Sequence, residues 1–154
     1  MTARKDLIME YYIAYGSNLN VEQMKLRCPG AKVYKKALMN GWKLTFRRTY
    51  LNIEPDANSS VDVVIWKITK QDELNLDRYE GYPRLYDKEY FAFPADGKIM
   101  TAMVYRMDPE RFPIEPPRPD YLQTVADGYR TFDYDVSKLV GIAKQSGYDG
   151  PDTV

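Results

Sequence analysis

The 154-residue sequence contains no histidine and only one cysteine, Cys28. The absence of histidine excludes the Ser-His-Asp and Cys-His catalytic arrangements and the HExxH type of zinc site. A single cysteine forms neither an internal disulfide nor a zinc site, and this usage is typical of a reducing compartment. If the protein is an enzyme, a carboxylate, a lysine or a tyrosine must therefore carry the protons.

A surplus of charge of one sign is also absent, because 22 basic residues balance 22 acidic ones. Nucleic-acid-binding proteins usually carry a basic surplus, so no nucleic-acid partner is expected. No apolar run approaches the roughly 20 residues that a membrane span requires, and the beginning of the chain (MTARKDLIME) lacks the apolar region of a signal peptide. We therefore expect a cytoplasmic protein with no membrane partner.

The spacing of apolar and turn-forming residues predicts an α+β fold with a closed or nearly closed sheet. About six strands are expected, at residues 7–15, 31–39, 42–46, 61–68, 86–93 and 98–107. Helices are expected at residues 20–28, 69–80, 119–128 and 135–146. Asn40-Gly41 predicts a hairpin between the second and third strands, and residues 53–60 (IEPDANSS) have the composition of a turn.

Five prolines lie in residues 109–119, so this segment cannot form regular structure. It is too short to separate two domains. We expect a single domain over residues 1–154, with a core at about 10–130 and a C-terminal helical extension at about 131–150. The sequence leaves two roles open for the proline-rich segment: a lid over a pocket, or a loop packed beside it.

The turn Tyr15-Gly16-Ser17-Asn18 is the first candidate for a functional site. It lies between a predicted buried strand and a helix. Glycine permits unusual backbone angles, and successive amides near a helix N-terminus can bind a carboxylate or a phosphate. The alternative is an ordinary turn, because glycine, serine and asparagine are common in turns.

Glu80 is the second candidate, and it lies at the end of the helix predicted from residue 69. Leu76, one turn earlier, is expected to face the core, so Glu80 points the same way. The negative end of the helix dipole, and shielding from water by Tyr79, Tyr82 and Pro83, should raise the pKa of its carboxyl group. Glu80 is therefore a candidate general base, and the alternative is a solvated glutamate at a helix end.

Together these features resemble the γ-glutamylcyclotransferase family, which includes plant relatives first described as induced by avirulence genes. The resemblance rests on three segments: YYIAYGSNLN at Tyr11 to Asn20, LDRYEGYPRLYDKEY at Leu76 to Tyr90, and PRPDYLQTVADGY at Pro117 to Tyr129. Their order and spacing cover most of residues 10–130.

The resemblance implies a compact β-barrel of mixed strand direction with flanking helices. Glu80 falls on the family's catalytic acid/base. The substrate-binding residues that it implies are Tyr12, Ile13, Ala14, Tyr15, Gly16, Ser17, Asn18, Tyr86 and Tyr121. The matches at Tyr86 and Tyr121 are looser than that at Glu80, because the chain contains 14 tyrosines, and packing in the core is the alternative role for Tyr86.

The activity that the resemblance implies is the cyclisation of a γ-glutamyl amide. The α-amine of the substrate attacks its own γ-glutamyl carbonyl, and 5-oxoproline and an amino acid or an amine are released. Glu80 transfers the protons, and the reaction requires no metal and no cofactor. The partner is a small-molecule γ-glutamyl substrate, and a homodimer is an alternative to a monomer.

Two other functions stay open. The enzymes that cleave γ-glutamyl-ε-lysine usually carry Tyr-Gly-Thr at the turn, so Tyr-Gly-Ser at residues 15–17 favours an amino acid as the leaving group. A γ-glutamyl-amine cyclotransferase, or an enzyme that removes a γ-glutamyl protecting group, is the first alternative. A member that binds a small molecule without turnover is the second, because a fold does not fix a function.

Overall fold

The structure, a computed structural model, describes residues 9–154 and confirms the α+β fold. The strands are β1 (Glu10–Ala14), β2 (Lys32–Arg47), β3 (Tyr50–Ile68), β4 (Asp87–Ala95) and β5 (Lys98–Arg106). The helices are the short 3₁₀ helix η1 (Ser17–Leu19), α2 (Val21–Arg27), α3 (Lys70–Tyr79), α4 (Pro119–Thr131) and α5 (Val136–Gln145). Leu7 and Ile8, where the first strand was predicted to begin, lie outside the described residues.

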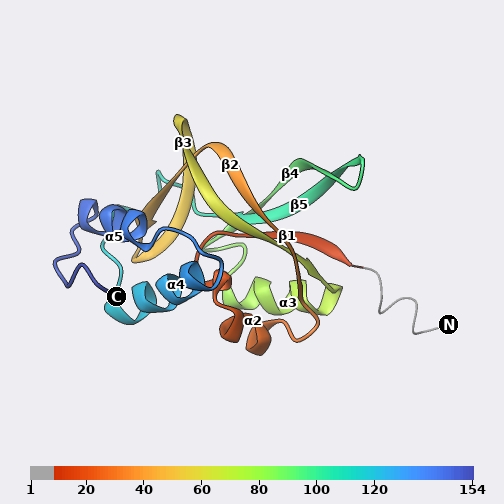
Figure 1. The fold of residues 1–154 in the computed structure, drawn as a ribbon, viewed down its shortest axis with the longest axis horizontal. Coiled ribbons are helices and arrows are strands. Elements are labelled where there is room, and N and C mark those ends of the chain that lie inside the picture. Colours follow the sequence, from red (N-terminus) through yellow and green to blue (C-terminus); the bar gives the residue numbers. More distant parts are fainter. Residues whose placement is uncertain (1–8) are drawn as a thin grey trace.

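The strands form one mixed sheet in the order β2-β3-β1-β5-β4 (Figure 1). β1, at its centre, runs antiparallel to β3 and parallel to β5. The expectation of a closed barrel needs correction, because β2 and β4 are the outer strands of the described sheet and do not pair with each other. Side chains bridge these edges instead: Tyr34 Oη donates to Asp96 Oδ2 at 3.1 Å, and the rings of Trp42 and Phe91 lie 5.2 Å apart. Aromatic rings occupy the gap where a backbone ladder would have closed the sheet.

Asn40-Gly41 does not form the predicted hairpin. β2 continues through this pair, and residues on both sides of it pair with β3. The register shifts here because residues 56–59 of β3 lie opposite Gly41 alone. The segment predicted as a turn, residues 53–60, is part of β3 and contains a local turn in which Asp56 accepts hydrogen bonds from Asn58 and Ser59. Two of the predicted strands are therefore one, and the sheet has five strands rather than about six.

The chain reverses between β2 and β3 at Arg48-Thr49, where both residues have positive φ angles of 47° and 70°. Positive φ at both central residues is the conformation of a type I′ hairpin turn, whose twist matches that of the strands. Residues 50–52, which follow this turn, were not predicted as a strand. They reach the site described below.

The helices start near the predicted positions, and local sequence explains why. The side chain of Asn20 caps α2 by accepting a hydrogen bond from the backbone amide of Gln23 (3.1 Å). Thr69 and Asp72 form a reciprocal capping box at the start of α3. α4 packs directly on η1, since a Cβ atom on Gly128 would lie 2.7 Å from the carbonyl carbon of Leu19.

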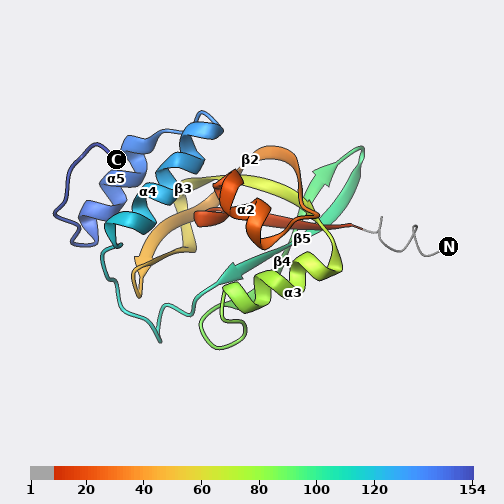
Figure 2. The ribbon, with the colours of Figure 1, turned by 90° about the horizontal axis from the view of Figure 1, so that it is seen from below.

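α2, α3 and α4 lie on the same side of the sheet, and Figure 2 shows α2 between the other two (Figures 1 and 2). The apolar faces of these helices supply core residues such as Met24, Leu76 and Leu122, all of which are fully buried. None of the helices in residues 9–154 combines the length and the apolar character that a membrane span needs. Because α2, α3 and α4 pack on one side of the sheet, the ends of β1 and α3 lie together beside α4.

Candidate active site

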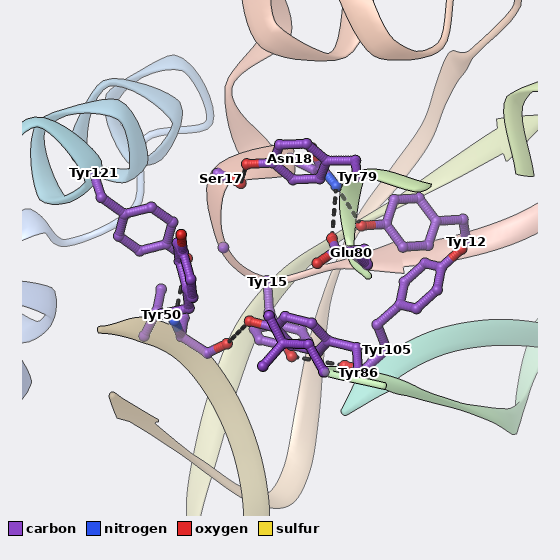
Figure 3. A pocket seen from close by; sticks show the side chains of 13 residues that line it. Tyr12, Tyr15, Ser17, Asn18, Tyr50, Tyr79, Glu80, Tyr86, Tyr105 and Tyr121 are labelled. Atoms are coloured by element: carbon purple, nitrogen blue, oxygen red, sulfur yellow. Dashed lines mark hydrogen bonds between the residues drawn. The ribbon is translucent and has the colours of Figure 1, made fainter. Parts of the chain in front are cut away.

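A cavity of about 120 Å³ lies where the end of β1, the end of α3 and the start of α4 meet (Figure 3). Aromatic and hydroxyl groups dominate its walls. Its lining consists of Tyr12, Tyr15, Gly16, Ser17, Asn18, Tyr50, Leu51, Tyr79, Glu80, Leu85, Tyr86, Tyr105 and Tyr121. Glu80 is the only acidic or basic residue in this set.

The loop after β1 forms one wall and leads directly into η1. The amide of Leu19 donates to the carbonyl of Gly16, and the amide of Asn20 donates to that of Ser17, each at 3.0 Å. The amides of Ser17 and Asn18 begin the turn and have no acceptor within it. A Cβ atom on Gly16 would lie 3.2 Å from Tyr121 Oη, so glycine lets the loop pass close to this tyrosine.

Glu80 caps the C-terminal end of α3, and its backbone amide donates to the carbonyl of Leu76 at 2.8 Å. The residue as a whole is partly exposed, but its carboxyl group faces the cavity, where Asn18 Nδ2 donates to Oε1 at 3.3 Å (Figure 3). Burial raises the pKa of Glu80 from 4.5 to about 8, and the positive charge of Arg27 offsets part of this rise. A carboxyl group with a pKa near the working pH can both accept and return a proton.

The tyrosine hydroxyls of the walls are held by hydrogen bonds. Tyr15 Oη donates to the carbonyl of Tyr105, and Tyr86 Oη donates to the carbonyl of Leu51, both at 2.7 Å. The amide of Leu51 in turn donates to Tyr121 Oη at 3.1 Å. Burial raises the pKa of Tyr15 and Tyr86 well above the usual value, so these walls are polar but uncharged near neutral pH.

A sequence model of the family described as gamma-glutamyl cyclotransferase, AIG2-like, matches residues 12–135. The chain belongs to this family. Gamma-glutamylcyclotransferase from Bos taurus is 30% identical over 130 residues, which cover 76% of this chain and 68% of the bovine protein. The protein of the same name from Homo sapiens is 29% identical with the same coverage.

A solved structure described as gamma-glutamyl cyclotransferase has the same fold, with a TM-score of 0.74 over 94% of this chain and 93% of the other. Its sequence identity of 24% supports the fold alone. Membership of the γ-glutamyl cyclotransferase family confirms the expectation of an enzyme of this type, and a small-molecule substrate fits it.

The cyclotransferase fold brings most of the predicted site residues together around the cavity. These are Tyr12, Tyr15, Gly16, Ser17, Asn18, Glu80, Tyr86 and Tyr121. Ile13 and Ala14 were also predicted to bind substrate, but they are buried in the core and do not line the cavity. Only the two tyrosines of the segment from Tyr12 to Tyr15 reach it.

Sequence reasoning missed four of the lining residues: Tyr50, Leu51, Leu85 and Tyr105. Tyr50 and Leu51 begin the part of β3 that was not predicted as a strand. Tyr79 was expected to shield Glu80 from water, and it does line the cavity, with its hydroxyl 3.0 Å from Ser17 Oγ. Tyr82 was expected to shield Glu80, but it is 40% exposed and lies outside the lining.

A second cavity of about 190 Å³ adjoins the first, and the two share the walls Ser17, Tyr50, Tyr79 and Tyr121. Its other lining residues are polar or charged: Gln23, Arg27, Thr49, Arg118, Asp120 and Thr124. The first cavity is therefore aromatic with one carboxyl group, whereas the second carries two arginines and one aspartate.

The proline-rich segment, residues 109–119, packs beside the cavities rather than over the first one. Arg47 Nη1 donates to the carbonyl of Phe112 at 2.8 Å, and the amide of Arg48 donates to that of Pro113 at 3.1 Å. These bonds tie the segment to the end of β2. None of its residues lines the first cavity, and only its last part, at Arg118, reaches the second.

Carboxylate and thiol groups that could share a metal ion are not gathered at the site. Among residues 9–154, no group of three or more histidine, cysteine, aspartate or glutamate side chains is placed to hold a metal ion. The polar side-chain groups of the residues that line the cavity are one carboxyl group, the tyrosine and serine hydroxyls and one asparagine amide.

Proposed function

We propose that the protein cyclises γ-glutamyl amides to 5-oxoproline, with Glu80 as the general acid/base. The observation that carries this proposal is the position of the Glu80 carboxyl group: it lies in a cavity walled by uncharged tyrosines, within hydrogen-bonding distance of Asn18 (3.3 Å). The chain contains no histidine, so a carboxyl group with a raised pKa is the natural proton carrier.

The reaction follows from the chemistry of the substrate. The α-amine attacks the γ-glutamyl carbonyl carbon, and the new carbon–nitrogen bond closes a five-membered ring. Because the substrate binds as an α-ammonium ion, Glu80 first takes up one of its protons to give the attacking amine, and it then returns this proton to the departing nitrogen as the original amide bond breaks. The proton that the ring nitrogen still has to lose leaves with the released amine. The products are 5-oxoproline and the free amine of the leaving group. Because both reacting groups belong to one molecule, holding it folded supplies several kcal/mol of the rate acceleration.

The loop between β1 and η1 has a second role in the proposal. The amides of Ser17 and Asn18 are directed to a negatively charged group of the substrate, either its α-carboxylate or the oxygen that becomes negative during attack. Gly16 is needed here because the loop runs close to Tyr121. The tyrosine walls exclude water and so favour ring closure over hydrolysis.

The raised pKa suits this chemistry. At pH 7 the free carboxyl group of Glu80 is mostly protonated, since its pKa is about 8. The α-ammonium group of a bound substrate brings a positive charge that lowers this pKa and favours the carboxylate needed to take up a proton. We expect kcat/KM to fall about tenfold per pH unit below pH 8, as it does when one group must be ionised.

The leaving group would occupy the second cavity, which shares a wall with the first. Arg118 favours a carboxylate there, so the first candidate substrates are γ-glutamyl amino acids. Asp120 in the same cavity is the feature that favours a cationic leaving group and hence the γ-glutamyl-amine alternative. Arg118→Ala should raise KM for amino-acid adducts, and Asp120→Asn should raise it for amines that carry a second positive charge.

A panel of γ-glutamyl amino acids and γ-glutamyl amines, with 5-oxoproline followed by mass spectrometry, tests the proposal. Turnover of amino-acid adducts supports the first candidate, and turnover of amines alone supports the second. Binding measured by calorimetry, without any product from the whole panel, would instead identify a small-molecule-binding member of the family. Glu22→Gln removes an 83% exposed carboxylate and provides a matched control for Glu80→Gln.

A further inference from the structure

We infer that Arg27 is a positioning residue of this site: it orients the Asn18 amide toward Glu80 and supplies a positive charge near the Glu80 carboxyl group. Arg27 ends α2 and lies outside the lining of the first cavity. The inference rests on the role proposed for Glu80, because Arg27 acts on the reaction only through Asn18 and the charge of that carboxylate.

Three contacts fix the guanidinium group. Nη1 donates to Asn18 Oδ1 at 2.6 Å, and Nη2 donates to Gln23 Oε1 at 2.8 Å. The centre of the guanidinium lies 3.5 Å from the centroid of the Tyr79 ring, a distance at which cation–π attraction is strong. Only arginine combines a planar fork of donors with stacking on an aromatic ring.

The bond to Oδ1 decides which way the Asn18 amide points. With its oxygen held by Arg27, the amide directs Nδ2 to Tyr12 Oη at 2.8 Å and to Glu80 Oε1 at 3.3 Å. If the amide rotated by half a turn, its oxygen would face the Glu80 carboxylate, and two acceptors would repel each other. Asn18 is 3% exposed, so water cannot easily replace the lost donors. Arg27 therefore keeps a hydrogen-bond donor directed at the carboxylate.

The charge of Arg27 acts on a site with few other charges. The titratable groups that face Glu80 from β1, α2, α3, β5 and α4 are tyrosines, the Cys28 thiol and Arg27 itself. Burial raises the pKa of Cys28 to about 12 and that of the buried tyrosines above the usual value, so these groups are neutral. Arg27 opposes the effect of burial on Glu80 and lowers its pKa.

The test compares Arg27→Gln and Arg27→Lys with the wild-type protein. Lys25→Gln is the matched control, because it removes a positive charge from the same helix at a side chain that is 69% exposed and pairs only with Glu22. The pKa of Glu80 is measured by NMR titration of ¹³C-labelled glutamate carboxyl groups, with Glu80→Gln used for assignment. This measurement needs no turnover. The rate of 5-oxoproline formation is measured separately from pH 6 to pH 9.5, roughly the range on either side of the expected Glu80 pKa.

In Arg27→Gln we expect the pKa of Glu80 to rise by about one pH unit, the lower end of the effect of a nearby opposite charge. We expect kcat to fall at least about tenfold at the pH optimum, with a smaller change in KM, because the Asn18 amide would no longer be held with its donor toward Glu80, the acid/base. Arg27→Lys should restore the Glu80 pKa toward the wild-type value but not the full rate, since lysine lacks the fork that holds both Asn18 and Gln23. Lys25→Gln should change neither quantity.

An unchanged Glu80 pKa in a folded Arg27→Gln protein would overturn the inference, and so would a wild-type rate in Arg27→Lys. The second result applies even if Arg27→Gln does not fold. A third outcome separates the two proposals. If Arg27→Gln shifts the pKa of Glu80 but even the wild-type protein forms no 5-oxoproline, the proposed function is contradicted, whereas the effect of Arg27 on the Glu80 site is supported. The two failures are therefore distinguishable.

Discussion

Replacing Glu80 with glutamine removes the carboxyl group of the cavity and should change how stability depends on pH. The folded protein holds the Glu80 proton up to about pH 8, whereas an unfolded chain releases it near 4.5. Unfolding therefore releases a proton between these two values, and the wild-type protein loses stability as pH rises through this range. The stabilising contribution of the protonated group is complete below pH 4.5 and is lost above pH 8. Glutamine does not titrate, so the variant lacks this loss.

The difference between the two pKa values sets an upper limit on the effect. Each pH unit corresponds to about 1.4 kcal/mol, so a rise from 4.5 to about 8 corresponds to about 5 kcal/mol. The partly exposed position of the residue reduces this figure, and we expect about 1–3 kcal/mol in practice. Glu80→Gln should therefore match the wild-type protein at pH 4.5 and exceed its free energy of unfolding by that amount at pH 9.

Urea unfolding at pH 4.5, 7 and 9, followed by circular dichroism, measures this difference directly. The Glu22→Gln control should show no such growth of the difference with pH, because the Glu22 carboxylate is 83% exposed. If the gain of Glu80→Gln were equal at all three pH values, or were largest at pH 4.5, the burial of an ionisable carboxyl group in this cavity would be refuted.

Other substitutions test the parts of the fold that hold the site. Gly128→Ala should destabilise the protein by about 1–3 kcal/mol and raise KM, because the new Cβ would lie 2.7 Å from the Leu19 carbonyl carbon. In thermal unfolding, the control Gly141→Ala should be neutral or stabilising, because its Cβ has no neighbour within 4 Å. Lys88→Met should lower the free energy of unfolding in urea by about 3–5 kcal/mol, since Lys88 Nζ is buried between Glu73 (2.6 Å) and Asp77 (2.9 Å). A decrease below about 1 kcal/mol would mean that these ion pairs are not buried in solution. Gly16→Val, introduced into the Glu80→Gln protein, should abolish the binding of a γ-glutamyl amino acid measured by calorimetry while the fold persists. The reason is that the new Cβ atom alone would approach Tyr121 Oη to 3.2 Å. Unchanged affinity would argue against the loop as a binding element.

Much of the fold follows from local patterns in the sequence. The helices were predicted close to their observed positions because capping residues such as Asn20 and Thr69 mark their starts. The error at Asn40-Gly41 has a physical cause. This pair is a strong hairpin signal, but both flanking segments pair with β3, and Gly41, with a φ of 86°, lies where the register shifts within one continuous strand. The true turn, Arg48-Thr49, lacks the asparagine and glycine that usually mark a type I′ turn.

Site residues were predicted correctly where the local sequence around them indicates their role. They were missed where only the pairing of distant strands places them in the cavity. Glu80 could be selected because its helix position places it with Leu76 on the side facing the core. Tyr50 and Leu51 could not, since they depend on the misplaced hairpin. Arg27 also had no signal in the sequence, because its importance lies in contacts with Asn18 and Tyr79 that only the packing of α2 creates.

The most direct test of the account is the product formed by the wild-type and Glu80→Gln proteins from a γ-glutamyl amino acid in H₂¹⁸O at pH 8. Intramolecular cyclisation predicts 5-oxoproline without ¹⁸O from the wild-type protein, and a rate lower by at least roughly 10²-fold in a folded Glu80→Gln protein. Glutamate containing ¹⁸O would show hydrolysis instead of cyclisation. A rate of 5-oxoproline release in Glu80→Gln close to that of the wild-type protein would contradict the role of Glu80.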